Sequence, residues 1–212
     1  MSHLTPSFPL LTPPPPPSPA ITTLLTTLNL QPHPEGGFFV ETDRDPLLIP
    51  SPFPTTTTTN NLPTRRDGFT PHLRNASTTI FYLLTPSSPQ GHFHRNRSRT
   101  VHTLHRGRGR YVVIHPASAT GDGDGEVRVE TFVVGGAVEK GERLQWVVEG
   151  GRWKGSFLLP DADGGEGSEG LLISETVVPG FEYEDHEFLS AAGLEGLLGE
   201  GGGGVGWLVR GG

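Results

Sequence analysis

The chain has 212 residues and a formal net charge of −7 at pH 7, and 33% of its residues are hydrophobic. It contains no cysteine, which excludes disulfides, thiolate nucleophiles and cysteine-ligated zinc. No apolar run approaches the roughly 20 residues that span a bilayer. The first lysine or arginine is Arg44, so the start lacks the charge of a secretory signal or a mitochondrial presequence. We therefore expect one cytoplasmic domain with appendages and no membrane partner.

Proline, threonine and glycine divide the chain into a central domain and flanking segments. Residues 1–20 contain eight prolines, which favours extended polyproline geometry and a disordered tail. Residues 46–75 carry repeated proline and five consecutive threonines, which predicts a long surface loop. Residues 199–212 are rich in glycine and are expected to be frayed. The domain itself is expected to span residues 21–198.

A short helix and a stiff turn open this domain. Apolar residues recur at helical spacing over residues 21–30, which predicts an amphipathic helix. In the following HPEGG turn (residues 33–37), Pro34 fixes its own φ and the two glycines permit backbone angles that other residues avoid. An extended segment is expected from Phe38. The turn aims the Glu35 carboxylate, which suits either a ligand contact or a buried hydrogen bond to a neighbouring strand.

Seven short runs rich in β-branched and aromatic residues follow, separated by Gly, Pro or Asp. They are predicted to be strands at residues 78–84, 91–98, 111–115, 127–134, 144–148, 155–159 and 171–178. Their spacing suits an antiparallel barrel. One or two helices are expected within residues 185–198, packed on the outside of this barrel.

Five blocks, in order along the chain, carry a family resemblance. They are HPEGGFFVET (33–42), STTIFYLL (77–84), HRNRSRTVHTLHRG (94–107), GERLQWVVEGGRW (141–153) and TVVPGFEYEDHEFL (176–189). Through these blocks the chain resembles a branch of the cupin superfamily that is catalogued as a domain of unknown function. The resemblance implies an all-β fold, a double-stranded β-helix or jelly-roll barrel with short flanking helices, usually a homodimer. It implies an open-ended pocket inside the barrel but no known reaction.

The strand that contains His92 and His94 is the expected place for any chemistry. Alternation along a strand puts both histidines on one face, which we expect to be the barrel interior, with the intervening arginines outside. Metal-binding cupins add an acidic residue a few positions on and a third histidine from a later strand. Here Arg99 takes the place of the acid and Lys154 stands where the third histidine would be.

A metal cofactor is therefore not expected, because a protonated lysine repels a dication. One metal-binding alternative stays open. It is a divalent ion held by His92, His94 and His102, with Glu35 or Glu175 supplying oxygen.

Two functions remain open at this point. The favoured one is binding of a small polar molecule in the barrel without established catalysis. Its candidate ligand-binding residues are Glu35, Tyr82, His92, His94, Gln145, Trp153 and Glu175. The alternative is an isomerase or epimerase acting on a sugar-like substrate, with or without a metal, in which His94 exchanges a proton with the help of Tyr82 or Glu35.

Charge is distributed unevenly along the chain. Six arginines fall within residues 95–110 with no acid among them, whereas residues 155–209 contain eleven acids and no lysine or arginine. Such a basic run could bind nucleic acid, but no aromatic platform is interleaved with it and the net charge is negative. We therefore expect no nucleic-acid partner. The arginine face is expected to meet the acidic C-terminal region, within one subunit or across a dimer.

Overall fold

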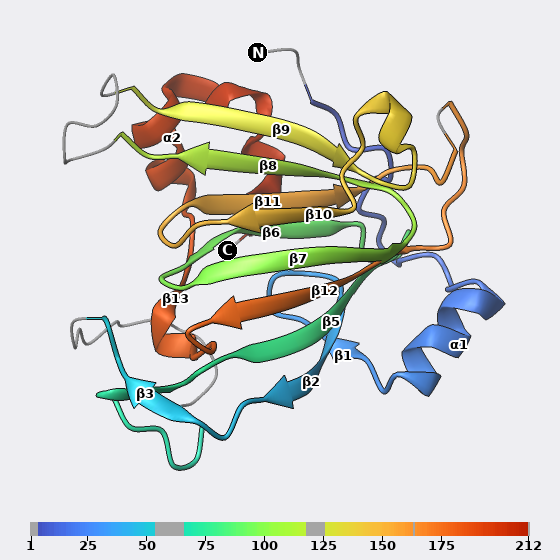
Figure 1. Ribbon diagram of the computed structural model, residues 1–212. Coiled ribbons are helices and arrows are strands. Elements are labelled where there is room, and N and C mark those ends of the chain that lie inside the picture. The colour runs from blue at the N-terminus through green and yellow to red at the C-terminus, as the bar shows by residue number, and fades with distance from the viewer. Residues whose placement is uncertain (1–3, 54–65, 118–125, 163, 212) are drawn as a thin grey trace.

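The computed structural model describes residues 4–53, 66–117, 126–162 and 164–211, and this part of the chain is mostly antiparallel β-sheet (Figure 1). The six-stranded sheet runs β1 (Gln31–Pro32), β2 (Phe38–Arg44), β5 (Thr78–Leu84), β12 (Leu171–Val178), β7 (Arg99–Arg106) and β10 (Gln145–Val148). The five-stranded sheet runs β13 (His186–Phe188), β6 (Gln90–Asn96), β11 (Trp153–Leu158), β8 (Gly109–His115) and β9 (Arg128–Val134). The all-β fold predicted from the sequence is confirmed.

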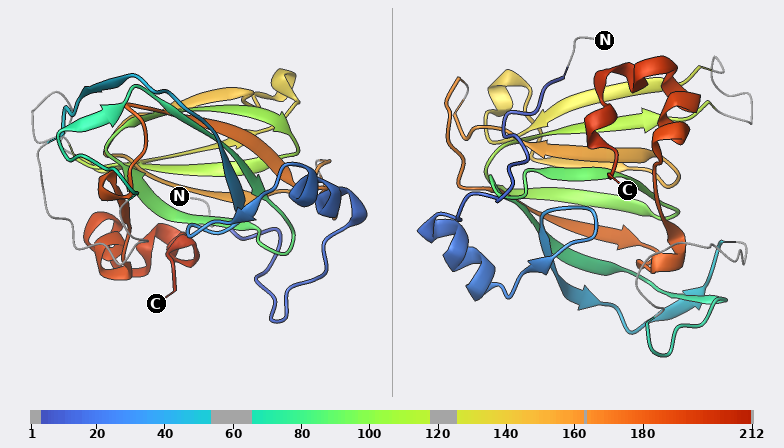
Figure 2. Two further views of the ribbon diagram at one scale, coloured as in Figure 1. Left: turned by 90° about the horizontal axis from the view of Figure 1, so that it is seen from below. Right: turned by 180° about the vertical axis from the view of Figure 1, so that it is seen from behind.

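The remaining elements lie around these two sheets (Figure 2). A small separate sheet pairs β3 (Leu48–Pro50) with β4 (Leu73–Asn75), so part of the segment expected to be loop forms strands. Residues 54–65 of that segment lie outside the described residues. The helices are α1 (Pro19–Thr27) and α2 (Ala191–Leu198), and the 3-10 turns are η1 (Val138–Lys140), η2 (Tyr183–Asp185), η3 (Glu200–Gly204) and η4 (Gly206–Leu208).

Strand alternation gives each sheet an inner and an outer face. On β8, Tyr111 and Val113 enter the main core between the sheets, whereas Val112 and Ile114 enter a second core on the outer face of the five-stranded sheet. Helix α1 covers the outer face of the six-stranded sheet, where Leu30, Leu83 and Leu172 form a third cluster. Apolar side chains are thus buried on both faces of both sheets. The main core surrounds the site described below.

The two ends of the chain pack on this framework. Phe8 contacts the main core, and the indole N–H of Trp207 donates to the carbonyl of Leu4 at 3.1 Å. Val205 and Leu208 are 1% and 0% exposed. The expectation of a frayed C-terminal segment is therefore corrected. Glycine dominates its composition, but its few apolar side chains close the outer core. None of the helices in the described part of the chain has both the length and the apolar composition that a bilayer span requires.

The predicted strands agree with the structure within a few residues, and two of them, β5 and β12, agree to the residue. Besides the short strands β1, β3 and β4, the strands β7 and β13 were not predicted. β7 alternates arginine, threonine and histidine with few apolar residues, and β13 has three residues within a segment assigned to helix. Both are specified by pairing with neighbours rather than by local propensity, since β7 lies between β12 and β10 and β13 pairs with β6.

We predict that the C-terminal segment contributes to global stability. Leu208→Ala removes a fully buried side chain and should lower the free energy of unfolding by about 2–5 kcal/mol in urea denaturation. The control, Leu144→Ala, truncates a side chain that is 50% exposed and should change stability by less than about 0.5 kcal/mol. Equal, small effects of both substitutions would mean that the segment is frayed after all.

Candidate functional site

The HPEGG turn delivers Glu35 into the space between the sheets. Gly36 and Gly37 have φ of +98° and +69°, and a Cβ on Gly36 would collide with the carbonyl of Gln90. The His92 N–H donates to the carbonyl of Glu35 at 2.7 Å, which pins the turn to β6. Only glycine fits this close approach with positive φ. The result is a carboxylate that is held inside the protein, with Glu35 only 7% exposed.

Three histidines surround the Glu35 carboxylate. Its Oε1 atom lies 2.8 Å from His186 Nε2 and 3.3 Å from His94 Nε2, and its Oε2 atom lies 3.7 Å from His33 Nδ1. Burial alone would raise the pKa of Glu35, but the neighbouring His94, His33 and His186 hold it well below its usual range. Glu35 is therefore a buried, ionised carboxylate.

His94 reaches this carboxylate because β6 is irregular. Lys154 pairs with His94 but Ser156 pairs with Gly91, so β6 has one more residue than β11 between these pairs. His94 is buried beside Glu35, while Phe93 points to the outer core. The expected alternation that placed His92 equally inside is corrected. His92 is half-buried, and its ring Nδ1 lies 2.9 Å from the Glu35 backbone carbonyl rather than at the carboxylate.

The tautomer of His94 follows from its contacts. Its Nδ1 lies 2.9 Å from the carbonyl of His92, an acceptor, so Nδ1 carries the proton. Burial lowers the pKa of His94 to about 3, with the charge of Lys154 acting in the same direction against the attraction of Glu35. The neutral ring therefore turns the lone pair of Nε2 toward the Glu35 carboxylate.

A second buried cluster lies next to the first. The Lys154 ammonium, 3% exposed, donates to Glu175 Oε2 at 2.6 Å and to His102 Nε2 at 2.8 Å. Burial would raise the pKa of Glu175, but Lys154 and His102 hold it well below its usual range. Burial and then Lys154 lower the pKa of His102, so its neutral Nε2 accepts from the ammonium. These three side chains come from β11, β12 and β7, in both sheets.

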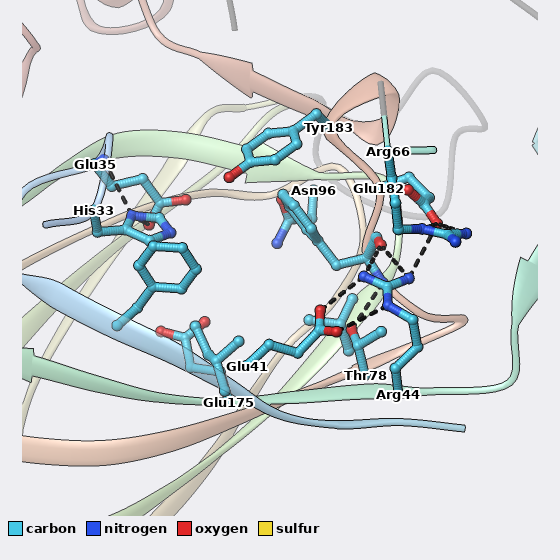
Figure 3. A pocket seen from close by; sticks show the side chains of 14 residues that line it. His33, Glu35, Glu41, Arg44, Arg66, Thr78, Asn96, Glu175, Glu182 and Tyr183 are labelled. Atoms are coloured by element: carbon cyan, nitrogen blue, oxygen red, sulfur yellow. Dashed lines mark hydrogen bonds and ion pairs between the residues drawn. The ribbon is translucent and has the colours of Figure 1, made fainter. Parts of the chain in front are cut away.

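A cavity of about 240 Å³ opens beside these clusters (Figure 3). Glu35, Glu175, Asn96, His33 and Tyr183 lie toward its inner end, and Glu41, Arg44, Arg66 and Glu182 lie toward the other. Its apolar lining consists of Phe39, Ile80, Val177 and Phe181.

The two ends of this cavity differ in how far their polar groups are satisfied. Arg44 and Arg66 both bind Glu182 Oε1, at 3.0 and 2.9 Å, so the charges at that end are paired. At the inner end Asn96 is 8% exposed, and its side-chain oxygen has no hydrogen-bond partner among the described residues. Figure 3 shows Asn96 and the Tyr183 ring directed into the cavity. The polar atom without a hydrogen-bond partner therefore lies at the inner end of the cavity.

The structure brings together only some of the residues predicted from the sequence. Glu35 and Glu175 line the cavity, and His94 lies beside Glu35. Tyr82 is buried near them, but its hydroxyl donates to the carbonyl of Gly36 at 2.8 Å, and burial followed by Glu35 and Glu175 raises its pKa well above its usual range. Tyr82 therefore braces the turn rather than facing a ligand.

Two predicted ligand contacts lie elsewhere. Trp153 is on the outer face of β11 in the second core, with the Arg95 guanidinium 4.4 Å from its ring centroid. Gln145 is exposed on β10, where its amide donates to Thr103 Oγ1 at 3.3 Å. Both assignments are corrected, because strand parity turns these side chains away from the space between the sheets.

Several residues of the site were missed, including Asn96 and three from a single block. His186, Tyr183 and Phe181 all belong to the TVVPGFEYEDHEFL block, which was used only to identify the resemblance. Their signal was a run of aromatic, acidic and histidine side chains after a proline-glycine turn. The position of this run in the fold could not be predicted from the sequence, because it depends on the pairing of β13 with β6.

The arginines of β6 meet the acidic segment within one subunit, as one of the two expected arrangements has it. Arg95 binds Glu187 at 2.7 Å, and Arg97 Nη1 lies 3.9 Å from Asp185 Oδ1. The buried Arg74 also binds Asp185, at 2.6 Å. These pairs dock the segment that carries Tyr183 and His186, so the charge asymmetry serves to position the site.

Comparison with known proteins gives a consistent result. Residues 22–189 match the family Cupin_5, described as Cupin superfamily (DUF985). The uncharacterized protein YML079W of Saccharomyces cerevisiae is 44% identical over 170 residues, which cover 80% of this chain and 75% of that protein. A hypothetical protein from Leishmania major superposes with a TM-score of 0.67 at 29% identity, covering 90% of this chain and 98% of that chain. Protein SO0799 from Shewanella oneidensis gives a TM-score of 0.63 at 23% identity, over 88% and 95% of the two chains, a likeness of fold alone.

We predict that Lys154 and Glu175 stabilise the fold only as a pair. Lys154→Met leaves a buried carboxylate without its cation and should cost about 3–5 kcal/mol of unfolding free energy, measured in urea. Adding Glu175→Leu removes both charges and should recover much of that loss. As a control, Arg99→Met breaks an exposed pair with Glu149 and should cost less than about 1 kcal/mol. A double variant as unstable as the sum of its single variants would contradict the pairing.

The lowered pKa values predict a loss of stability in acid. The unfolded chain binds a proton on His102 below pH 6.5 that the folded protein does not, so stability falls as pH drops from 6.5. Glu175 stabilises the fold fully above its unfolded value of 4.5 and loses this contribution as pH falls further. In EDTA-treated protein, urea titrations should show that His102→Gln reduces the slope between pH 6.5 and 4.5 by up to about 1.4 kcal/mol per pH unit. An unchanged slope would mean that His102 is protonated in the folded state.

Proposed function

The chain belongs to the DUF985 family of the cupin superfamily, and on that premise we propose that it binds a small molecule carrying hydroxyl or amine groups in the cavity between its sheets. The observation that carries this proposal is the inner end of the cavity. There the carboxylates of Glu35 and Glu175 and the amide side chain of Asn96 lie next to apolar walls. Oxygen acceptors in a buried site are matched by a ligand that brings donors.

The size of the cavity limits the ligand. Its volume of about 240 Å³ lies just below the roughly 300–1,000 Å³ typical of ligand pockets, so the ligand is metabolite-sized. Phe39 and Phe181 offer faces for an apolar or ring-shaped body. A monosaccharide-like polyol or an amine on a small hydrocarbon frame combines both features. An anionic ligand is disfavoured, because Arg44 and Arg66 at the other end already bind Glu182.

Binding is favoured over the isomerase or epimerase alternative by the position of the acid–base candidates. Proton transfer needs a group within hydrogen-bond reach of the substrate, about 2.6–3.2 Å. The Tyr82 hydroxyl is engaged by Gly36, and His94 Nε2 faces Glu35 instead of the cavity. The two residues expected to exchange a proton with a sugar-like substrate are therefore turned to other partners.

The experiment is a thermal-shift and native mass spectrometry screen of polyols, monosaccharides, amino sugars and small amines. A ligand at 100 times its Kd should add about 2.7 kcal/mol of stability. Asn96→Leu removes a buried acceptor and should weaken binding of the best compound by roughly 5–150-fold, the equivalent of about 1–3 kcal/mol. Gln145→Leu, which changes an exposed amide outside the cavity, is the matched control and should bind normally. Failure of every compound to shift the melting temperature, or equal binding by Asn96→Leu, would contradict the proposal.

A further inference from the structure

We propose that Glu35, His94 and His186 form a binding site for a divalent transition-metal ion. Each offers one donor atom, and the three donor atoms lie within 4.8 Å of one another. All three residues are buried. The inference concerns a metal ion rather than the small-molecule ligand, and the Glu35 carboxylate is common to both sites.

The spacing of the donors suits first-row metals. Metal–nitrogen and metal–oxygen distances near 2.0–2.2 Å place tetrahedral ligands about 3.3 Å apart. Glu35 Oε1 is 3.3 Å from His94 Nε2 and 2.8 Å from His186 Nε2. Small movements of these side chains around an ion would complete the geometry, with the proton between Glu35 and His186 released on binding.

The surroundings of His94 resemble those of a metal ligand. A ligating histidine donates its second ring N–H to a carbonyl or carboxylate, which fixes the ring and exposes the other nitrogen. His94 Nδ1 makes this contact with the carbonyl of His92, 2.9 Å away. Its Nε2 faces the carboxylate of Glu35 at 3.3 Å, the separation expected of two ligands of one metal ion.

The local charge also favours a cation. Among the described residues, the ion-pair partners of Glu35 are His33, His94 and His186, with no lysine or arginine. The Lys154 ammonium, which would repel a dication, is paired with Glu175 at 2.6 Å. That leaves the negative charge of Glu35 for an ion to neutralise.

This set of ligands differs from the metal site that the sequence analysis left open as an alternative. That alternative joined His94 to His92 and His102, but the His92 ring contacts the Glu35 backbone carbonyl and His102 Nε2 accepts from Lys154. The expectation of no metal rested on a set without His186. Two imidazoles and one carboxylate suit zinc, iron(II) or manganese(II) and leave a coordination position for water or another ligand.

The experiment uses zinc and cobalt as probes on the full-length protein, after EDTA treatment and removal of the chelator. Isothermal titration should give one zinc ion per chain, and cobalt should develop visible absorption bands. His186→Gln and Glu35→Gln should each weaken zinc binding at least tenfold. His105→Gln, which changes an exposed histidine on β7 away from the three ligands, is the matched control and should retain it.

One readout needs no variant and covers the case in which a substitution prevents folding. X-ray absorption of the zinc-loaded wild type should show two imidazole ligands and oxygen in the first shell. The proposal is overturned if the wild type retains no zinc at micromolar concentrations, if imidazole scattering is absent, or if His105→Gln abolishes binding while His186→Gln does not. None of these outcomes depends on the small-molecule screen, so each proposal can fail alone.

Discussion

A carboxylate that is removed from water must be held by donors or positive charge, and the burial of Glu35 imposes this requirement on the centre of the molecule. The requirement is met by parts distant in sequence. The glycines of the HPEGG turn allow the close approach to β6, and the bulge in β6 brings His94 to the carboxylate. β13 then adds His186 at 2.8 Å. Loss of the His186 side chain would remove the donor at 2.8 Å and leave the buried carboxylate poorly satisfied, at a cost of several kcal/mol.

The interior is divided along the strands into an apolar end and an ionic end. β12 shows the division within one strand, because Leu171 and Ile173 pack in the main core whereas Glu175 binds Lys154. Buried ion pairs contribute little net stability compared with well-packed apolar residues. Two ionic clusters beside a cavity therefore fit a binding site better than they fit a device for stability, and this agrees with the proposals made for Asn96 and for Glu35.

Local signals in the sequence were enough to predict the framework. β5 and β12 were predicted to the residue because their β-branched and aromatic runs are bounded by Gly, Pro or polar residues. The stiff turn at Glu35 was also predicted, including the two roles open to its carboxylate. These features depend on the properties of a few consecutive residues, which a single sequence contains in full.

The features that were missed depend on pairing between distant segments. β7 is polar enough to read as loop and is a strand because β12 and β10 flank it. His186 enters the site only through β13, and Trp153 leaves it through strand parity. The burial of Leu208 could not be read from a segment dominated by glycine. Register and packing of this kind are tertiary properties, so local propensity does not determine them.

The most direct measurement of the central claim is the interaction free energy between Glu35 and His186. A double-mutant cycle with Glu35→Gln, His186→Gln and the double variant, in metal-free protein at pH 7, isolates this pair from its surroundings. A hydrogen bond to a buried charged group predicts a coupling free energy of about 1.5–3 kcal/mol. A coupling near zero would contradict the account, because Glu35 would then not be held by the histidines between the sheets.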